Sequence, residues 1–322
     1  MINRGQMAWL AGVILAFVME SGAAQALDLV RVGKTASNAL AFTPAEIGTA
    51  TGIWAKHGIE ITVLQYAGDG KMQQGLIANE IEFGFGSGPA MGFIAKDVPA
   101  KTVGVIANEP LSMGLIVSQN SVVKTPEDLK GRKIGITTNG SLTYWLARAL
   151  ARRHGWAPDA IRTVPMGTIS GQIAGLKSGA VDGFIMSASV GYMLADRNEG
   201  KVLLHFGDEI KDFHTHLIFA TNKVIKEQPD VVRRFLAGWQ ETVEYMFSHR
   251  QEAIELAHKT TDLPLKIQEE EFDKVMPMMS RDLRFNDKAL SVLVDSFIEL
   301  EILDKKPDPK TLYTEEFLPA KK

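Results

Sequence analysis

Cysteine is absent from the 322 residues, so the chain can form no disulfide and offers no thiol nucleophile. A bacterial lipoprotein would need a cysteine just after its signal peptide, and that residue is missing as well. These absences exclude disulfide scaffolds, cysteine-dependent enzymes and lipid-anchored lipoproteins.

Long apolar runs and basic blocks are also missing. No stretch after residue 19 approaches the length of a transmembrane helix. Lysine and arginine are scattered, the net charge is −3, and no basic block with interleaved aromatics argues for a nucleic-acid partner. No Walker loop, nucleophile elbow or dinucleotide fingerprint is present, so we expect no catalytic residues and no cofactor.

The amino terminus has the pattern of a secretory signal peptide. Arg4 supplies a positive charge, residues 7–19 are an apolar run of 13, and Ala24-Gln25-Ala26 offers small residues for cleavage. We predict a signal peptide over residues 1–26 and a freely diffusing protein in the periplasm.

A repeat at a spacing of one hundred residues is the most informative feature present. Residues 75–84 (GLIANEIEFG) correspond to residues 175–184 (GLKSGAVDGF), and each segment runs into a serine, Ser87 or Ser187. A second pair, VGKT at 32–35 and IGIT at 134–137, keeps the same order. The repeat predicts two similar α/β lobes with a ligand cleft between them.

Strand and helix patterns alternate as far as residue 221, which favours mostly parallel sheets covered by helices on both faces. Four helical segments follow and are expected to return to the first lobe. We therefore predict a first part of lobe 1 at 27–112, lobe 2 at 113–216 and the return to lobe 1 at 217–322. The strands at 113–119 and 217–221 would be the two crossings between the lobes.

Ligands of open α/β sheets bind beyond the carboxyl ends of strands, where helices begin. The sequence Thr43-Pro44-Ala45-Glu46 predicts a capping box that opens a helix reaching His57. Ser87-Gly88-Pro89 and Asn139-Gly140-Ser141 predict two further helix starts. The backbone N–H groups at such starts favour anionic oxygen.

The same strand tips carry little charge. Lys34 is the only cation near them, whereas several aromatic side chains, Phe42 among them, lie close by. A small organic solute with one polar or anionic end fits this composition, and we expect it to be sulfonate-like or aromatic and carboxylated. Glu82 and Asp182 occupy matching positions before strands, and we expect them to fix turns by accepting backbone N–H bonds.

His214 and His216 with nearby aspartates are the one pattern that could suggest a metal site. Residues two apart on a strand face the same side, and no third ligand is specified, so we predict no metal. We favour a hinge-side histidine that touches the ligand, His214, over a metal ligand, and a histidine that is only hydrogen-bonded over both.

Four stretches resemble the periplasmic solute-binding proteins of the nitrate, sulfonate and taurine transport family, which also includes thiamine-precursor pyrimidine binders. They are IWAKHGIEI at 53–61, residues 75–86, TPEDLKGRKIG at 125–135 and GLKSGAVD at 175–182. PDVVRRF at 229–235 is similar to the family's first carboxy-terminal helix. The resemblance implies a type II periplasmic binding fold that closes on a solute and delivers it to the permease and ATPase subunits of an ABC importer.

The resemblance places ligand-binding positions at the strand tips, and the aromatic, helix-start and histidine patterns add Phe42, Asn139 and His214. The full set is Ser37, Asn38, Phe42, Ser87, Gly88, Asn108, Thr138, Asn139, Gly140, Ser141, Ser187 and His214. We expect a monomer that is not an enzyme. Two alternatives stay open: an exported sensor subunit, and a pyrimidine-phosphate synthase of the same fold. The synthase uses a cysteine-rich segment and pyridoxal phosphate, so the missing cysteine and the signal peptide argue against it.

Overall fold

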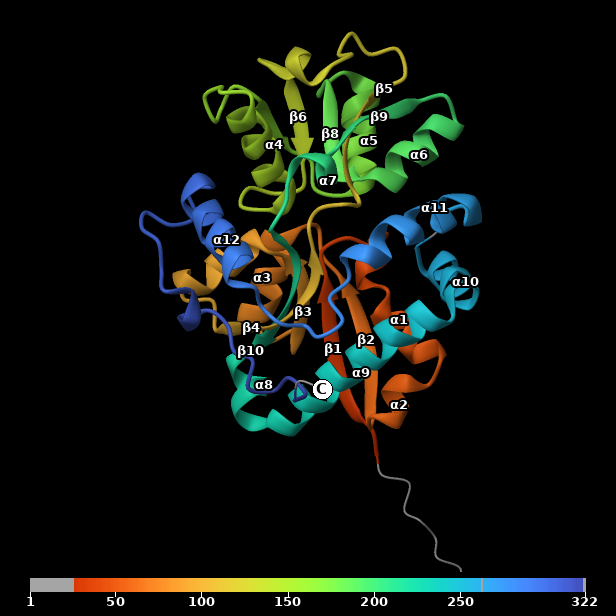
Figure 1. Ribbon diagram of the computed structural model, residues 1–322, viewed down its shortest axis with the longest axis vertical. Helices are drawn as coiled ribbons and strands as arrows, with labels where there is room; N and C mark the ends of the chain where they lie inside the picture. Colours follow the sequence, from red (N-terminus) through yellow and green to blue (C-terminus); the bar gives the residue numbers. More distant parts are fainter. Residues whose placement is uncertain (1–25, 262, 321–322) are drawn as a thin grey trace, which may run out of the picture.

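The computed structural model describes residues 26–261 and 263–320. The predicted signal peptide therefore lies outside the described residues, apart from its last one. Two lobes are stacked along the long axis of the molecule, with the carboxy-terminal helices beside the lower lobe (Figure 1).

Lobe 1 is built on a five-stranded sheet in the order β2-β1-β3-β10-β4. Strands β1 and β2 and strands β1 and β3 are parallel, whereas β10 is antiparallel to both β3 and β4. The strands are β1 (Asp28–Lys34), β2 (Ile59–Gln65), β3 (Phe83–Ser87), β4 (Ala100–Asn108) and β10 (His214–Thr221).

Lobe 2 repeats this arrangement in the order β7-β6-β8-β5-β9, in which β5 takes the place of β10 as the antiparallel strand. Its strands are β5 (Met113–Ser118), β6 (Lys133–Ile136), β7 (Arg162–Pro165), β8 (Gly183–Ser187) and β9 (Gly200–His205). The sequence repeat therefore corresponds to β3 and β8, the central strands of the two sheets. One strand of five runs against the others in each lobe, as expected for mostly parallel sheets.

Glu82 and Asp182 perform the same task in the two lobes. Glu82 accepts the backbone N–H of Arg31 at 2.8 Å, and Asp182 accepts that of Lys133 at 2.8 Å. Each carboxylate thereby ties the turn before the central strand to the neighbouring strand. The predicted turn-fixing role is confirmed.

Helices cover both faces of the lobe 1 sheet. One face packs against α1 (Pro44–Ala50), α2 (Ile53–Lys56) and α9 (Pro229–Ser248) through stacked rings such as Phe83 and Phe235, 3.9 Å apart. The other face packs against α3 (Asp69–Ile77), the 3-10 helix η2 (Pro89–Lys96) and α12 (Asp287–Glu299). The remaining elements are η1 (Leu40–Phe42), α8 (Asn222–Glu227), α10 (Arg250–Thr261), α11 (Leu265–Val275), η4 (Met276–Met278) and η5 (Pro309–Thr311).

Lobe 2 carries η3 (Pro126–Leu129), α4 (Leu142–Arg153), α5 (Ile169–Ser178) and α6 (Ala188–Asp196), with α7 (Phe206–Glu209) after its last strand. The two lobes touch through α4 and α12, where the indole N–H of Trp145 donates to Glu299 at 3.0 Å. Trp145 also stacks on Phe213 with ring centroids 4.0 Å apart. No helix within 26–261 and 263–320 is both long and apolar enough to cross a membrane.

Two predictions of local structure are wrong. The crossings between lobes are not the strands at 113–119 and 217–221, because β5 lies wholly in the lobe 2 sheet and β10 in the lobe 1 sheet. The chain changes lobe in the connectors 109–112 and 210–213 instead. Because β10 begins at His214, the structure puts residues 214–216 in the lobe 1 sheet.

The predicted capping box at Thr43 is the second error. The Thr43 hydroxyl donates to the Leu40 carbonyl, and Glu46 pairs with the buried Lys34 instead of reaching back to the cap. The helix also ends at Ala50, and a new turn, α2, begins after Gly52. The sequence pattern did not show that η1 precedes α1. The Thr43 hydroxyl binds the Leu40 carbonyl of η1 and is therefore not available to cap α1.

Candidate functional site

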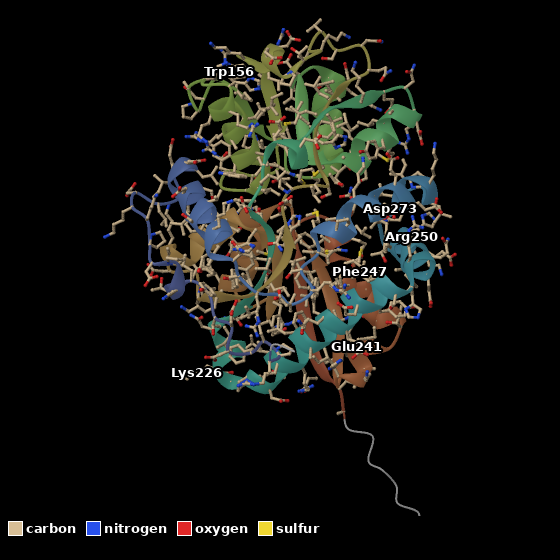
Figure 2. All side chains as sticks on the ribbon, in the orientation of Figure 1. Trp156, Lys226, Glu241, Phe247, Arg250 and Asp273 are labelled. Atoms are coloured by element: carbon tan, nitrogen blue, oxygen red, sulfur yellow. The ribbon has the colours of Figure 1, made fainter. Side chains whose placement is uncertain are left out.

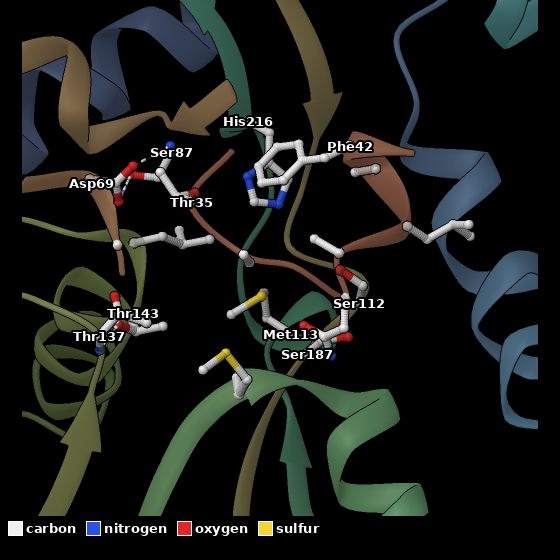
Figure 3. A pocket seen from close by; sticks show the side chains of 18 of the residues that line it. Thr35, Phe42, Asp69, Ser87, Ser112, Met113, Thr137, Thr143, Ser187 and His216 are labelled. Atoms are coloured by element: carbon white, nitrogen blue, oxygen red, sulfur yellow. Dashed lines mark hydrogen bonds between the residues drawn. The ribbon is translucent and has the colours of Figure 1, made fainter. Parts of the chain in front are cut away.

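A cavity of about 60 Å³ lies between the two lobes. Figure 3 shows His216, Phe42, Asp69 and Ser87 from lobe 1 around one part of it, and Thr137, Thr143 and Ser187 from lobe 2 around another. Nineteen residues line it: Thr35, Ala36, Asn38, Ala39, Leu40, Ala41, Phe42, Gly68, Asp69, Ser87, Ser112, Met113, Thr137, Leu142, Thr143, Met186, Ser187, His216 and Glu271.

The segment after β1 supplies one wall of this cavity. It includes η1, which places the Phe42 ring edge-on to the His216 imidazole with centroids 4.8 Å apart. Asn38 is buried, and neither atom of its amide has a hydrogen-bond partner within the described chain. A buried amide with no partner is costly, so Asn38 is suited to meeting a polar ligand group.

Asp69 begins α3, and its carboxylate is buried against the end of β3. Its two oxygens accept the hydroxyl and the backbone N–H of Ser87, both at 2.8 Å. The backbone N–H of Leu142, at the start of α4 in lobe 2, also favours the ionised form, whereas burial raises the pKa of Asp69 overall. Asp69 thus links the amino termini of one helix from each lobe.

Glu271 makes a second contact between the lobes. It lies on α11, which Arg250 and Asp273 tie to α10 through a double hydrogen bond at 3.0 and 2.9 Å (Figure 2). Oε1 of Glu271 accepts the hydroxyl of Ser187 at 2.6 Å, and Oε2 has no partner within the described chain. Burial raises the pKa of Glu271 to about 7.

The two histidines of β10 have different surroundings, because His216 lines the cavity and His214 does not. His216 lines the cavity, and its Nδ1 has no hydrogen-bond partner within the described residues. His214 accepts the Asn286 N–H at 3.0 Å, so its other nitrogen donates to the Asn108 side chain at 2.7 Å. Burial lowers the pKa of both histidines to about 4, so both are neutral at pH 7.

Hydroxyl groups of lobe 2 form a connected set at the start of α4. Thr143 accepts the backbone N–H of Thr137 at 2.9 Å, and its hydroxyl also contacts those of Thr137 and Ser141 at 3.0 and 2.9 Å. Ser141 caps α4 by accepting the Tyr144 N–H. Ser141 therefore holds the helix start, while Thr137 and Thr143 face the cavity.

The structure brings four of the twelve predicted site residues to the cavity: Asn38, Phe42, Ser87 and Ser187. Ser37 is exposed beside them. Asn108 and His214 bind each other elsewhere, and Gly88 lets the backbone approach β10, where a Cβ atom would stand 2.0 Å from the His214 carbonyl oxygen.

The four predicted site residues in the tip after β6, Thr138 to Ser141, do not line the cavity. Asn139 is exposed, Thr138 faces Gly68 of lobe 1, and Gly140 has a φ of +74° and lies against Phe93 of lobe 1. Together with Ser141, these residues shape the contact between the lobes. The neighbouring Thr137 and Thr143 line the cavity in their place.

Several lining residues were missed from the sequence: Thr35, Asp69, Ser112, Met113, Met186, His216 and Glu271. For Asp69 a signal existed, because it opens a predicted helix directly after the tip of β2. Glu271 gave none, since its helix follows the repeat and its approach to lobe 2 is set by tertiary packing.

The chemistry of the cavity is that of binding by hydrogen bonds and apolar contact. Two carboxyl groups and no lysine or arginine are among its lining residues. Lys34 is not among the lining residues, and its ammonium group pairs with Glu46. In the part of the chain that the structure describes, no three His, Asp or Glu side chains are grouped closely enough to hold a metal ion.

Comparisons with known proteins point to one family. The model of the protein family described as NMT1/THI5 like matches residues 40–253, about two thirds of the chain. A Bacillus subtilis (strain 168) protein named as a binder of aliphatic sulfonates is 24% identical over 302 residues, 92% of this chain and 89% of its own length.

A second relative carries an enzyme's name. The 4-amino-5-hydroxymethyl-2-methylpyrimidine phosphate synthase of Legionella pneumophila is 22% identical over 288 residues, 86% of this chain and 88% of its own. Among solved structures, the periplasmic aliphatic sulphonate binding protein SsuA from Escherichia coli aligns with a TM-score of 0.72 at 20% identity, covering 89% of this chain and 92% of that one. The predicted two-lobed α/β periplasmic binding fold is confirmed.

Proposed function

Because the chain belongs to the NMT1/THI5-like family, we propose that it is the solute-binding component of an ABC importer. In this proposal the protein works in the periplasm, binds one small organic solute between its lobes and presents the closed form to a membrane permease. It is not an enzyme.

One observation carries this proposal: the small cavity around Asn38 and Ser187 takes its lining from both lobes. Ser87 and Asn38 come from lobe 1, and Ser187 and Thr143 from lobe 2. A solute held by both lobes stabilises their closed arrangement, which is the signal that a permease can read.

The enzyme alternative has less support. The synthase uses a cysteine-rich segment, and this chain has no cysteine. A sensor subunit would have the same cavity, so only the membrane partner separates it from an importer component.

The test has two stages. Thermal denaturation of residues 27–322 against a broad solute library should give at least one binder that raises the midpoint, with X-ray scattering showing closure. The loaded protein should then stimulate ATP hydrolysis by the organism's reconstituted permease–ATPase complex. A solute that binds without stimulating hydrolysis would favour the sensor, and turnover of the solute would favour the enzyme.

A further inference from the structure

The charges around the cavity specify more than a small solute. We propose, resting on the proposed function, that the solute carries a cationic nitrogen group such as an alkylammonium or amidinium, which binds the buried carboxylate of Glu271 in a cavity whose second acidic side chain is Asp69. The remainder of the solute is apolar and short.

The first argument is the inventory of charge. Asp69 and Glu271 line the cavity and are 3% exposed each, whereas no cationic side chain lines it. Both histidines of β10 are held neutral by burial, which lowers the pKa of His216 to about 4. An anionic group placed here would meet two carboxyl groups with no counterion, and a buried charge without a partner is strongly disfavoured. The proposal therefore departs from the anionic end that the sequence led us to expect.

The second argument concerns the helix starts that would otherwise receive an anion. The amino termini of α4 and α6 both face the cleft from lobe 2, and such positions favour negative charge. The Leu142 N–H of α4 already acts on Asp69, and Ser187 and Ser189 at the start of α6 already interact with Glu271. Carboxyl groups of lobe 1 therefore occupy the anion-favouring positions of lobe 2.

The third argument concerns the buried polar atoms of the cavity that have no hydrogen-bond partner in the described chain and can accept a hydrogen bond from a solute. Oε2 of Glu271 and Nδ1 of His216 are buried with no hydrogen-bond partner in the described chain, as is the Asn38 amide. A protonated amine or amidine is rich in N–H donors and meets the acceptors among these groups. Phe42, Met113 and Met186 provide apolar surface for the rest of the molecule.

The experiment compares short solutes that differ in the head group. Propylamine and acetamidine are the cationic probes, and propionate and 1-propanesulfonate are the anionic ones. Each is titrated into the ligand-free protein by calorimetry at pH 6, 7 and 8. We expect heats of binding and a raised unfolding midpoint for the cations only.

The pH profile adds an independent readout. Glu271 has a pKa of about 7, and a cation binds to its ionised form, so affinity for the cationic probes should rise about tenfold from pH 6 to pH 8. Lys274 on the same helix is the charged group that acts on Glu271. Asp69 and His216 are the other titratable side chains that line the cavity, and η1, η4 and the start of α6 contain none. The rise is therefore expected to follow Glu271.

Two variants and a control complete the test. Glu271→Gln should lower cation affinity at pH 8 at least tenfold and flatten the pH profile, and Asp69→Asn should lower affinity at all three pH values. Glu270→Gln is the control, because it removes a carboxylate of the same helix that is not among the cavity-lining residues. It should change neither the affinity for the cationic probes nor its dependence on pH. Scattering by each variant shows whether it keeps the folded shape.

The outcomes separate the two proposals. Binding of the anionic probes with affinity that falls as pH rises, or cation binding indifferent to both variants, would overturn the cationic solute and leave the solute-binding function standing. Failure of every probe and of the broad library would overturn both proposals.

Discussion

Asn38 is 4% exposed, yet neither its amide nitrogen nor its amide oxygen has a partner in the described chain. Leaving such a group buried costs about 1–3 kcal/mol. Proteins retain an unfavourable residue of this kind where it serves a function. The neighbouring Ser37 is exposed, so water can satisfy its hydroxyl. Substituting the two residues one at a time therefore tests whether the Asn38 side chain itself binds the solute.

We predict that Asn38→Ala weakens binding of the identified solute about tenfold or more, because one or two hydrogen bonds to the ligand are lost. The free energy of unfolding without ligand should change by less than about 1 kcal/mol, since the removed amide is already unpaired. Titration calorimetry and urea unfolding measure the two quantities. Ser37→Ala is the control and should alter neither; equal affinity in both variants would remove Asn38 from the site.

At this scale the sequence predicted the hydroxyl and amide groups but not the charges. Asn38, Phe42, Ser87 and Ser187 follow strands of the repeat, so strand order alone brings them to one cavity. Glu271 reaches the same place from a helix outside the repeat. Its position depends on how α11 packs against α6, which no local pattern encodes.

Strand β10 determines much of lobe 1 at the scale of single elements. It pairs with both β3 and β4, and the Gly88 N–H donates to the Thr215 carbonyl at 3.0 Å. Gly88 has ordinary helical dihedral angles, so its small size, and not its flexibility, is what the position requires. A methyl group there would stand 2.0 Å from the backbone oxygen of His214.

Gly88→Ala is therefore expected to destabilise the protein by about 1–3 kcal/mol, since a strand backbone cannot move aside as a side-chain end can. Urea unfolding at constant m-value measures the loss. Gly70→Ala is a matched control in α3, where the nearest atom to a new methyl is 3.9 Å away. It should be neutral or stabilising by up to about 1 kcal/mol through helix propensity. Equal stability of the two variants would contradict the packing argument.

Helix starts show where local pattern succeeds and where it fails. Thr125 and Asp128 form a capping box at the start of η3. Thr43 and Glu46 have the same spacing, but Thr43 donates to the Leu40 carbonyl of η1, and Glu46 forms an ion pair with the buried Lys34. A local motif is reliable only when no long-range partner is available to its residues.

The whole molecule is a duplicated sheet joined by two short connectors. The repeat at one hundred residues predicted this architecture, since equal strand orders follow from equal strand and helix patterns. The crossings were misplaced by a few residues because β5 and β10 read as strands, and a sequence does not say in which sheet a strand lies. The closeness of the lobes, visible in Figure 1, depends on contacts such as those of Gly140.

Gly140 and Gly155 flank the two ends of α4, and both have positive φ, +74° and +68°. A methyl at Gly140 would stand 2.9 Å from Cζ of Phe93 in the other lobe, whereas Gly155 has open space. Asparagine tolerates this backbone conformation better than most residues, so Gly140→Asn and Gly155→Asn should cost similar, small amounts of stability.

Only Gly140→Asn places a side chain between the lobes, so only this variant should resist closure. We expect the solute Kd to rise about tenfold, the equivalent of about 1.4 kcal/mol, and the radius of gyration with solute to stay closer to the open value. Gly155→Asn should bind and close like the unmodified protein. If both variants close equally on solute, the contact between Gly140 and Phe93 is not part of the closed state, and closure is governed by the Asp69 and Glu271 contacts alone.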